Sequence, residues 1–321
     1  MLVNLCKALP HISDNALLVF KEKLITGGKH MEFIQQFING LNLGSIYALM
    51  ALGYTMVYGI AKMLNFAHGD IIMVGAYTIS VGATMFGLSP IASVLLSMVV
   101  CTILGVVIEK IAYKPLRLAS PLTVLITAIG VSYFLQSTAL LIFGSEQRRV
   151  ASVITVKGFN LGPIELTGES VVTLGATTLI MIGLALFINF TKTGKAMLAV
   201  SEDRGAAELM GINVNKTISI TFAVGSMLAA VAGALFVSSY GFVGPYTGAL
   251  PGIKAFVAAV LGGIGSIPGA MLGGILLGII ESFSKAYIST QLSDAIVFGV
   301  LIVVLLVKPS GLLGKQKTTK V

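Results

Sequence analysis

Long stretches without a charged side chain constrain this chain more than any other feature of its sequence. Asp, Glu, Lys and Arg are absent from the windows 33–61, 71–108, 122–143, 171–190, 217–253, 255–280 and 295–307. A helix needs about 20 apolar residues to cross the hydrocarbon core of a bilayer. The window 71–108 is long enough for two such helices, separated by the turn sequence Gly-Leu-Ser-Pro at 87–90. We therefore expect an all-α integral membrane protein.

The composition leaves little room for a soluble domain. Only 11% of the 321 residues are charged and 56% are hydrophobic, whereas soluble domains carry roughly 25% charged residues. The net charge of +8 does not point to nucleic acid, because the basic residues fall in short segments between apolar windows. Basic residues in that position set the orientation of a membrane protein. We expect a membrane protein that binds no nucleic acid.

The distribution of Lys and Arg predicts which loops share a side of the membrane. Segments 109–120 and 191–216 and the C-terminal tail carry an excess of basic residues and are placed in the cytoplasm, together with Lys62. The segment 144–170 is balanced in charge and is placed outside, with a small hairpin from 152–157 and 162–166. The assignment of loops to the two sides is consistent if the chain has about eight transmembrane helices and an external N-terminus.

The first 30 residues differ from the rest, because they mix charged residues with only one short apolar patch. We expect residues 1–30 to be an N-terminal extension and Met31 to be the true start of a permease domain that spans 31–321. The sequence Gly-Gly-Lys-His at 27–30 can be encoded by a purine-rich tract that resembles a bacterial ribosome-binding site.

A short polar segment, 201–211, lies between two long apolar windows. Ser201 is expected to cap the N-terminus of a helix, with Glu202 and Asp203 in its first turn. Gly211 is placed to end that helix in the left-handed conformation. The residues between are good helix formers: Ala206, Ala207, Glu208, Leu209 and Met210. We interpret the segment as a docking handle for a separate motor protein.

Glycines suggest where helices break and where they pack. A short seventh crossing, from about 253 to 267, is interrupted by the Gly-rich sequence 262–269 and either crosses the membrane or re-enters it. Gly residues four apart lie on one helix face and let two backbones approach closely. This spacing occurs at Gly265, Gly269 and Gly273, and again at Gly40 and Gly44. Helix packing is the favoured interpretation, and a hinge or pathway wall is the alternative at 265–273.

Polar groups near the hydrocarbon boundary are candidates for a pathway or gate. Asn65, His68 and Asp70 lie at the junction of the first two spans, where they either satisfy helix ends at the interface or take part in gating. The further pathway or gate candidates are Gly262, Gly263, Gly265 and Ser266.

Several kinds of chemistry are missing from the sequence. The segment 193–196, Thr-Gly-Lys-Ala, lacks the leading Gly and the final hydroxyl of a P-loop, so the chain has no motif that cradles nucleotide phosphates. His68 is the only histidine after His30, which excludes a multi-histidine metal site. Glu109 and Glu281 fall at predicted helix ends, which weakens a proton-coupled mechanism. We expect a chain that is not an enzyme and holds no cofactor.

Several stretches together resemble the branched-chain amino acid ABC importer permeases. They are GSIYAL at 44–49, GYTMVYG at 53–59, NFAHGD at 65–70, KAF at 254–256 and, most specifically, AAVLGGIGSIPGA at 258–270. The resemblance covers essentially everything after Met31, and the short chain is similar to the LivH-type member rather than its larger LivM-type partner.

The resemblance implies an importer for leucine, isoleucine and valine in the bacterial cytoplasmic membrane. This chain would pair with a LivM-type permease as a heterodimer. Two cytoplasmic ATP-binding subunits would hold ATP and Mg, and an external amino-acid-binding protein would supply the substrate. A permease in such a system needs no strong substrate site of its own.

The resemblance also carries the ABC coupling motif onto the segment 201–211, at Glu202, Asp203, Ala206, Ala207 and Gly211. This chain departs from the strict motif, because Glu202 is followed by Asp-Arg-Gly rather than by Ala-Ala.

Two other functions are weighed against the importer. Gly-rich, broken segments at 62–75 and 252–270, one in each half, also fit a self-contained secondary transporter or channel for small polar solutes. An intramembrane enzyme lacks a nucleophile–base pair in this sequence. If the chain is an importer subunit, its substrate can also be another amino acid or a small amide, since related permeases carry these.

Overall fold

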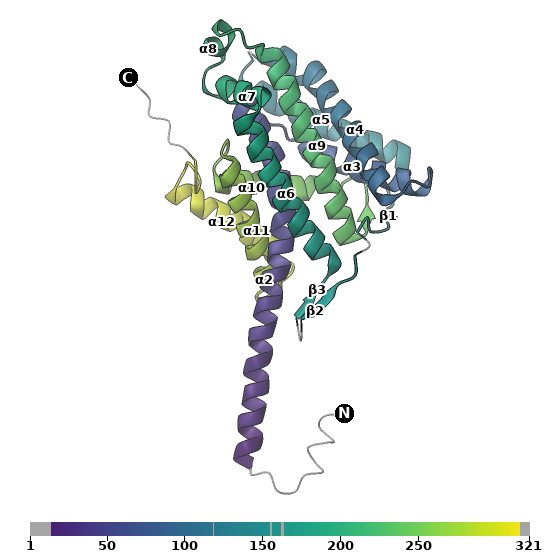
Figure 1. The fold of residues 1–321 in the computed structure, drawn as a ribbon, viewed down its shortest axis with the longest axis vertical. Helices are drawn as coiled ribbons and strands as arrows, with labels where there is room; N and C mark the ends of the chain where they lie inside the picture. The colour runs from purple at the N-terminus through teal and green to yellow at the C-terminus, as the bar shows by residue number, and fades with distance from the viewer. Residues whose placement is uncertain (1–13, 118, 155, 162–163, 315–321) are drawn as a thin grey trace.

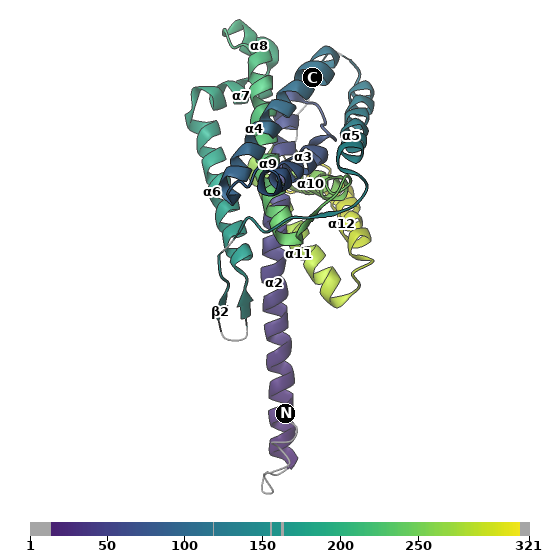
Figure 2. The ribbon, with the colours of Figure 1, turned by 90° about the vertical axis from the view of Figure 1, so that its right-hand side faces the viewer.

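Helix α2 (Asp14–Ala61) packs through its C-terminal part on α9 (Val214–Tyr240), α10 (Ala249–Gly262) and α11 (Ile267–Tyr287), and its N-terminal part projects beyond the other helices (Figures 1 and 2). The structure is a computed structural model, and it describes residues 14–117, 119–154, 156–161 and 164–314. The expected extension 1–30 falls partly outside the described residues, and residues 14–30 continue α2.

Ten further α-helices follow α2 in the described part of the chain. They are α3 (His68–Thr84), α4 (Pro90–Ile108), α5 (Pro121–Phe143), α6 (Gly168–Phe190), α7 (Lys192–Glu202), α8 (Arg204–Leu209), α9 (Val214–Tyr240), α10 (Ala249–Gly262), α11 (Ile267–Tyr287) and α12 (Ser293–Val307). A π-helical turn, Glu109–Tyr113, and a 3₁₀ turn, Lys114–Leu116, continue α4 towards α5.

Six of the described helical segments are long and apolar enough to cross a membrane. They are Met31–Ala61, Pro90–Leu116, Pro121–Phe143, Gly168–Phe190, Val214–Tyr240 and Ile267–Tyr287. Two shorter apolar helices, α10 and α12, join them, and α3 contributes 17 residues more. The sequence-based expectation of an all-α multi-pass membrane protein with about eight spans therefore agrees with the structure in outline.

Burial separates a central pair of helices from a peripheral set. In the most apolar window of each helix, 89% of residues are buried in α2 and 72% in α9, against 28% in α4, 22% in α5 and 28% in α6. The peripheral helices turn large apolar side chains outward, such as Ile91, Leu141 and Leu179. Lipid tails are as apolar as these side chains, so such a surface is stable in a bilayer.

Two faces of α11 pack on neighbouring helices through glycine. Towards α2, a Cβ on Gly278 would lie 2.1 Å from the backbone nitrogen of Gly44, and one on Gly40 would lie 2.8 Å from the Cα of Ile279. Towards α10, a Cβ on Gly273 would lie 2.1 Å from the carbonyl of Ala258. The backbones are therefore in direct contact, which only a missing side chain permits.

The break between α10 and α11 falls where the sequence predicts it. Helix α10 ends at Gly262, and α11 begins at Ile267 with Pro268 in its first turn. Gly269 is in contact with the carbonyl of Gly262, which holds the two helices together at the break. The expected face of Gly265, Gly269 and Gly273 is incomplete, because Gly265 lies before α11 with a positive φ of 93°.

Two small two-stranded sheets interrupt the helices. Strand β1 (Arg148–Arg149) pairs with β4 (Phe242–Val243), and β2 (Phe159–Leu161) pairs with β3 (Ile164–Leu166), both antiparallel. The second pair is the expected hairpin, but its first strand is 159–161 and not 152–157. The Gly-Pro sequence at 162–163 is the turn signal, and paired strands must flank it directly.

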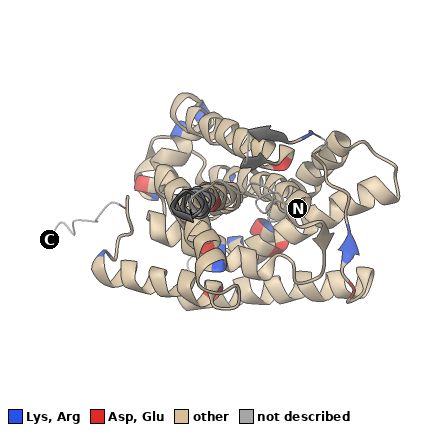
Figure 3. Ribbon diagram, turned by 90° about the horizontal axis from the view of Figure 1, so that it is seen from below, with Lys and Arg blue, Asp and Glu red and all other residues tan. Residues whose placement is uncertain are grey.

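The basic loops meet at one end of the molecule, which we name the α8 end. Arg117 donates a hydrogen bond to Asn215, which joins the segment after α4 to the start of α9, and Arg204 donates one to the carbonyl of Ala61, which joins α8 to the end of α2. The β2–β3 hairpin lies away from this end (Figures 1 and 2). Seen from below, most of the ribbon carries no charge (Figure 3).

Candidate functional site

The segment between α6 and α9 forms two helices rather than the single capped helix expected from the sequence. Ser201 and Glu202 end α7, and the Ser201 hydroxyl donates to the carbonyl of Leu198 instead of capping a helix. The N-cap of α8 is Asp203, whose carboxylate accepts a hydrogen bond of 3.0 Å from the backbone nitrogen of Ala206. The predicted cap at Ser201 is therefore wrong. Asp is as good an N-cap as Ser, and Asp203 directly precedes the first residue of α8.

The C-terminal end of α8 is as the sequence predicts. Gly211 has a positive φ of 81°. Its backbone nitrogen donates to the carbonyl of Glu208, and that of Ile212 donates to the carbonyl of Ala207. These two bonds make a Schellman motif, which needs a residue in the left-handed conformation.

Helix α8 presents an apolar tip to its surroundings. Leu209 is 90% exposed and Met210 is 81% exposed, while Ala207 is buried against the rest of the fold. Ala206 and Glu208 are exposed beside them. Apolar side chains this exposed at the end of a membrane protein that carries the basic loops are typical of a contact surface for another protein.

Arg204 and Arg117 attach the α8 end to the helices below. Arg117 forms an ion pair with Glu109, whose side chain is fully buried, and Glu109 also accepts a 2.6 Å hydrogen bond from the hydroxyl of Ser219 in α9. Burial lowers the pKa of the Arg204 guanidinium, and the positive charge of Arg117 lowers it further. Asp203 and Arg204, two residues that depart from the strict coupling motif, thus have structural partners in this chain.

Asn65, His68 and Asp70 are all buried, and each has a different neighbour. Asn65 accepts a 2.9 Å hydrogen bond from the hydroxyl of Tyr113. The ring of His68 packs edge-on against Tyr54, with centroids 4.7 Å apart. Asp70 faces α5, so the three side chains have different partners, while the backbone nitrogen of His68 donates a 3.1 Å hydrogen bond to the carbonyl of Asn65.

The Asp70 carboxylate ties α5 to the core. It accepts a hydrogen bond of 2.9 Å from the amide nitrogen of Gln136 and another from the hydroxyl of Ser132. Helix α5 is otherwise among the least buried helices, so these bonds contribute much of its attachment. The stacking of Tyr77 on Phe143, with centroids 4.2 Å apart, is a second contact between α3 and the end of α5.

The turn 263–266 between α10 and α11 lies against the C-terminal end of the described chain. Leu312 and Leu313 donate backbone hydrogen bonds to the carbonyls of Leu261 and Gly262. Gly263 has a positive φ of 106°, and a Cβ there would lie 2.4 Å from the nitrogen of Gly314. Ser266 caps α11 by accepting a 3.2 Å hydrogen bond from the nitrogen of Gly269.

A very small cavity separates Asn65 from this turn. It measures about 10 Å³ and is lined by Tyr54, Tyr58, Leu64, Asn65, Phe256, Ala259 and Ile264. A space of this size holds about one water molecule. Asn65 is the one predicted pathway residue that lines this cavity, which lies between α2 and α10.

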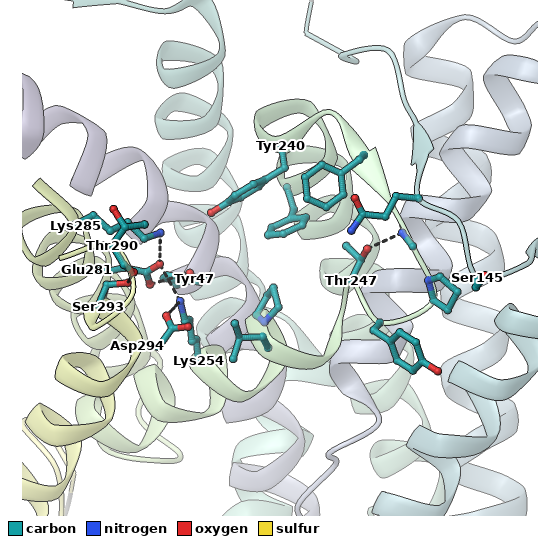
Figure 4. A pocket seen from close by; sticks show the side chains of 18 residues that line it. Tyr47, Ser145, Tyr240, Thr247, Lys254, Glu281, Lys285, Thr290, Ser293 and Asp294 are labelled. Carbon is teal, nitrogen blue, oxygen red and sulfur yellow. Dashed lines mark hydrogen bonds and ion pairs between the residues drawn. The ribbon is translucent and has the colours of Figure 1, made fainter.

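A much larger cavity, about 410 Å³, lies further along the same two helices. Figure 4 shows its lining, with Tyr47 from α2, Tyr240 from the end of α9, Lys254 from α10, Glu281 and Lys285 from α11, and Asp294 from α12. Tyr47 precedes Tyr54 by seven residues on α2, a rise of about 10 Å. The cavity is bordered by Ser145, Gln147 and the segment 244–247, so it lies beside the β1–β4 pair.

Four charged side chains line one side of this large cavity. The ammonium of Lys254 lies 2.8 Å from a carboxylate oxygen of Glu281 and 2.6 Å from one of Asp294. The ammonium of Lys285 lies 2.6 Å from Glu281. The hydroxyl of Tyr47 donates a 3.0 Å hydrogen bond to the other oxygen of Glu281. We name Lys254, Glu281, Lys285 and Asp294 the four-charge cluster.

Sequence reasoning assigned no role to the four-charge cluster. The sequence predicts Glu281 at a helix end, but α11 continues to Tyr287 and buries the Glu281 side chain completely. The error arises because a charge-free window stops at the first charge, whether or not the helix stops there. Lys254 carried a usable signal, since it alone separates the apolar windows 217–253 and 255–280.

A metal centre has no basis in the part of the chain that the structure describes. Among those residues, no group of three or more His, Cys, Asp or Glu side chains is arranged to hold a metal ion.

Known proteins of one transport family are similar to this chain over most of its length. The family described as "Branched-chain amino acid transport system / permease component" matches residues 36–305. The chain is 44% identical to the high-affinity branched-chain amino acid transport system permease protein BraD of Pseudomonas aeruginosa and to the LivH protein of Escherichia coli K12. Each of these alignments covers 90% of this chain and 98% of the relative. A probable LivH protein of Methanocaldococcus jannaschii is 31% identical over 84% of this chain and 89% of its own length.

Proposed function

This chain belongs to the permease-component family of branched-chain amino acid transport systems, and from that membership we propose that it is a membrane subunit of an ABC importer for leucine, isoleucine and valine. The observation that carries the proposal is the match to the family over residues 36–305, which takes in all six long apolar helices at least in part. The importer resides in the bacterial cytoplasmic membrane.

The proposed importer divides its work among several chains. This permease pairs with a LivM-type paralogue, and the amino acid passes between the two. Two cytoplasmic subunits bind ATP and Mg and hydrolyse the nucleotide, which accords with the lack of a P-loop in this sequence. An external binding protein delivers the amino acid.

Helix α8 is the proposed contact with the ATP-binding subunits. Its apolar tip, Leu209 and Met210, is exposed at the end that carries the basic loops. Asp203 and Gly211 fix where the helix begins and ends. Movement of a motor subunit would pass through α8 to α9 and, through the bond from Arg204 to Ala61, to the end of α2.

Reconstitution tests the proposed transport. We expect ATP-dependent leucine uptake into proteoliposomes only when this chain, its paralogue, the ATP-binding subunits and the loaded binding protein are all present. Uptake by this chain alone would favour a secondary transporter and overturn the importer.

A matched pair of variants tests the proposed coupling contact. Met210→Ser removes an 81% exposed apolar side chain from the α8 tip, and Met85→Ser removes a 69% exposed one from the loop between α3 and α4. Met85 lies at the other end of α4 from Glu109, away from the α8 end. We expect only Met210→Ser to reduce stimulation of the ATPase by the loaded binding protein. Equal stimulation in both variants would remove α8 from the contact.

A further inference from the structure

We propose that the large cavity beside the four-charge cluster is a binding site for the amino acid itself, occupied after release from the binding protein and before passage through the permease. The inference rests on the proposed import of amino acids. It assigns the charged head group of the substrate to Lys285 and Asp294, and the aliphatic side chain to the wall formed by Phe236, Tyr240 and Leu250.

The burial of the four-charge cluster is the first reason. The side chains of Lys254 and Glu281 are only 5% and 1% exposed. Moving an ion out of water costs several kcal/mol even after relaxation, and apolar residues of similar volume serve packing as well or better. Charged side chains within membrane-spanning segments are therefore functional candidates.

The second reason is that two side chains of the four-charge cluster are buried while the other two are partly exposed. Glu281 is fully buried and already accepts from Lys254, Lys285 and Tyr47. Lys254 is held between Glu281 and Asp294. The more accessible charges are those of Lys285, 36% exposed, and Asp294, 41% exposed. A buried ion pair thus presents one cation and one anion towards the cavity.

One accessible cation and one accessible anion match a zwitterion. The ammonium of Lys285 can donate to the α-carboxylate of an amino acid, and the carboxylate of Asp294 can accept from its α-ammonium. The cluster is itself balanced, with two cations and two anions. A neutral zwitterion therefore enters without adding net charge to the site, whereas a simple cation or anion would leave one charge uncompensated.

The rest of the lining suits an aliphatic side chain. The rings of Phe236 and Tyr240 stack with centroids 4.3 Å apart, and Leu250 and Pro251 lie in the first turns of α10. In Figure 4, Tyr240 points from α9 towards the charged side of the cavity. The volume of about 410 Å³ falls within the range of roughly 300–1,000 Å³ usual for small-molecule sites.

The position of the cavity fits a site of entry. It is bordered by Ser145 and Gln147, which belong to the segment 144–170 that the distribution of charge assigns to the outside. The small cavity lined by Tyr54 and Asn65 is a separate space, further along α2. A molecule in the large cavity would therefore lie near the outer loops, before the passage between the two permease subunits.

Binding of radiolabelled L-leucine to the assembled permease complex in nanodiscs, without the external binding protein, tests this site. We expect saturable binding that unlabelled isoleucine competes. Isoamylamine, which lacks the carboxylate, and 4-methylpentanoate, which lacks the ammonium, should compete at least tenfold more weakly than isoleucine, because each loses one charge-assisted contact. Absence of saturable binding, or equal competition by either analogue, would overturn the proposal.

Three variants localise the binding. Lys285→Met and Asp294→Asn should each weaken leucine binding about tenfold or more. Lys308→Met, the same replacement of a lysine just after the far end of α12, should leave it unchanged. A purely structural cluster would lower the melting temperature of the complex without changing the affinity for leucine, and that result contradicts the proposal. If a variant fails to assemble, the competition pattern of the wild-type complex decides.

Uptake measured in parallel separates this inference from the proposed function. Leucine uptake by the complete importer, combined with no saturable binding to the complex, overturns the binding site alone. Failure of the complete importer to take up any branched-chain amino acid overturns the proposed function, and the site assignment with it.

Discussion

Replacing Gly278 by alanine should weaken the contact between α2 and α11 on which the core is built. The added Cβ would lie 2.1 Å from the nitrogen of Gly44, 2.2 Å from its Cα and 2.7 Å from the carbonyl of Gly40. All three are backbone atoms, so no side chain can rotate away. Ordinary contacts of a Cβ begin at 3.4 Å, and the two helices must therefore separate by more than an ångström over part of their length.

The expected effect of Gly278→Ala follows from the cost of overpacking, about 1–3 kcal/mol and occasionally more. This is a large part of a net stability that is commonly about 5–15 kcal/mol. In soluble domains of 150–250 residues, about 1 kcal/mol shifts the melting temperature by roughly 2–4 °C. We expect the apparent melting temperature of the purified complex to fall by several degrees. It is measured by size-exclusion chromatography of samples heated to increasing temperatures.

Gly299→Ala in α12 is the matched control. A Cβ at this position meets nothing within 4 Å, so only the gain in helix propensity remains. We expect the control to melt at or slightly above the wild-type temperature. If both variants melt together, the close approach of α2 and α11 does not contribute to stability and the argument from backbone contact fails.

Three further substitutions test other parts of the structure. Asp203→Ala removes the N-cap of α8 at a cost of about 0.5–2 kcal/mol, and hydrogen exchange of the α8 amides should accelerate while that of α7 stays constant. Asp70→Leu breaks both hydrogen bonds to α5 and should raise hydrogen exchange in that helix, whereas Asp70→Asn should change it less; equal rates in the two variants would argue against the tether. Arg117→Met leaves Glu109 buried without its cation and should destabilise the complex by roughly 3–5 kcal/mol. The double replacement of Arg117 and Glu109 by methionine should recover much of that loss of thermal stability, and no recovery would contradict the ion pair.

Features that depend on local sequence were predictable. The charge-free windows predict the long helices because a bilayer excludes charge along about 20 residues at a time. Gly211 predicts the end of α8 because only a residue tolerant of positive φ fits there. The Gly-rich sequence after Gly262 predicts the break before α11 for the same local reason.

Features that depend on partners distant in the sequence were not predictable. Lys254 and Glu281 stand 27 residues apart, and Tyr47 stands 234 residues from Glu281. A window of charge or hydropathy treats each of them alone, as an interruption of an apolar stretch. The same limit applies to Asn65 and Asp70, whose partners Tyr113 and Gln136 lie 48 and 66 residues away in the sequence.

The sequence by itself therefore determined that this chain lies in a membrane, where most of its helices begin and end, and to which family it belongs. The bilayer imposes the membrane location and the helix boundaries, because it excludes charged side chains and unpaired backbone groups along a run of consecutive residues. Only the tertiary structure decided which charges share a cavity and which glycines touch another backbone. Ion pairs and helix crossings are contacts between segments brought together by packing, and no property of either segment alone specifies its partner.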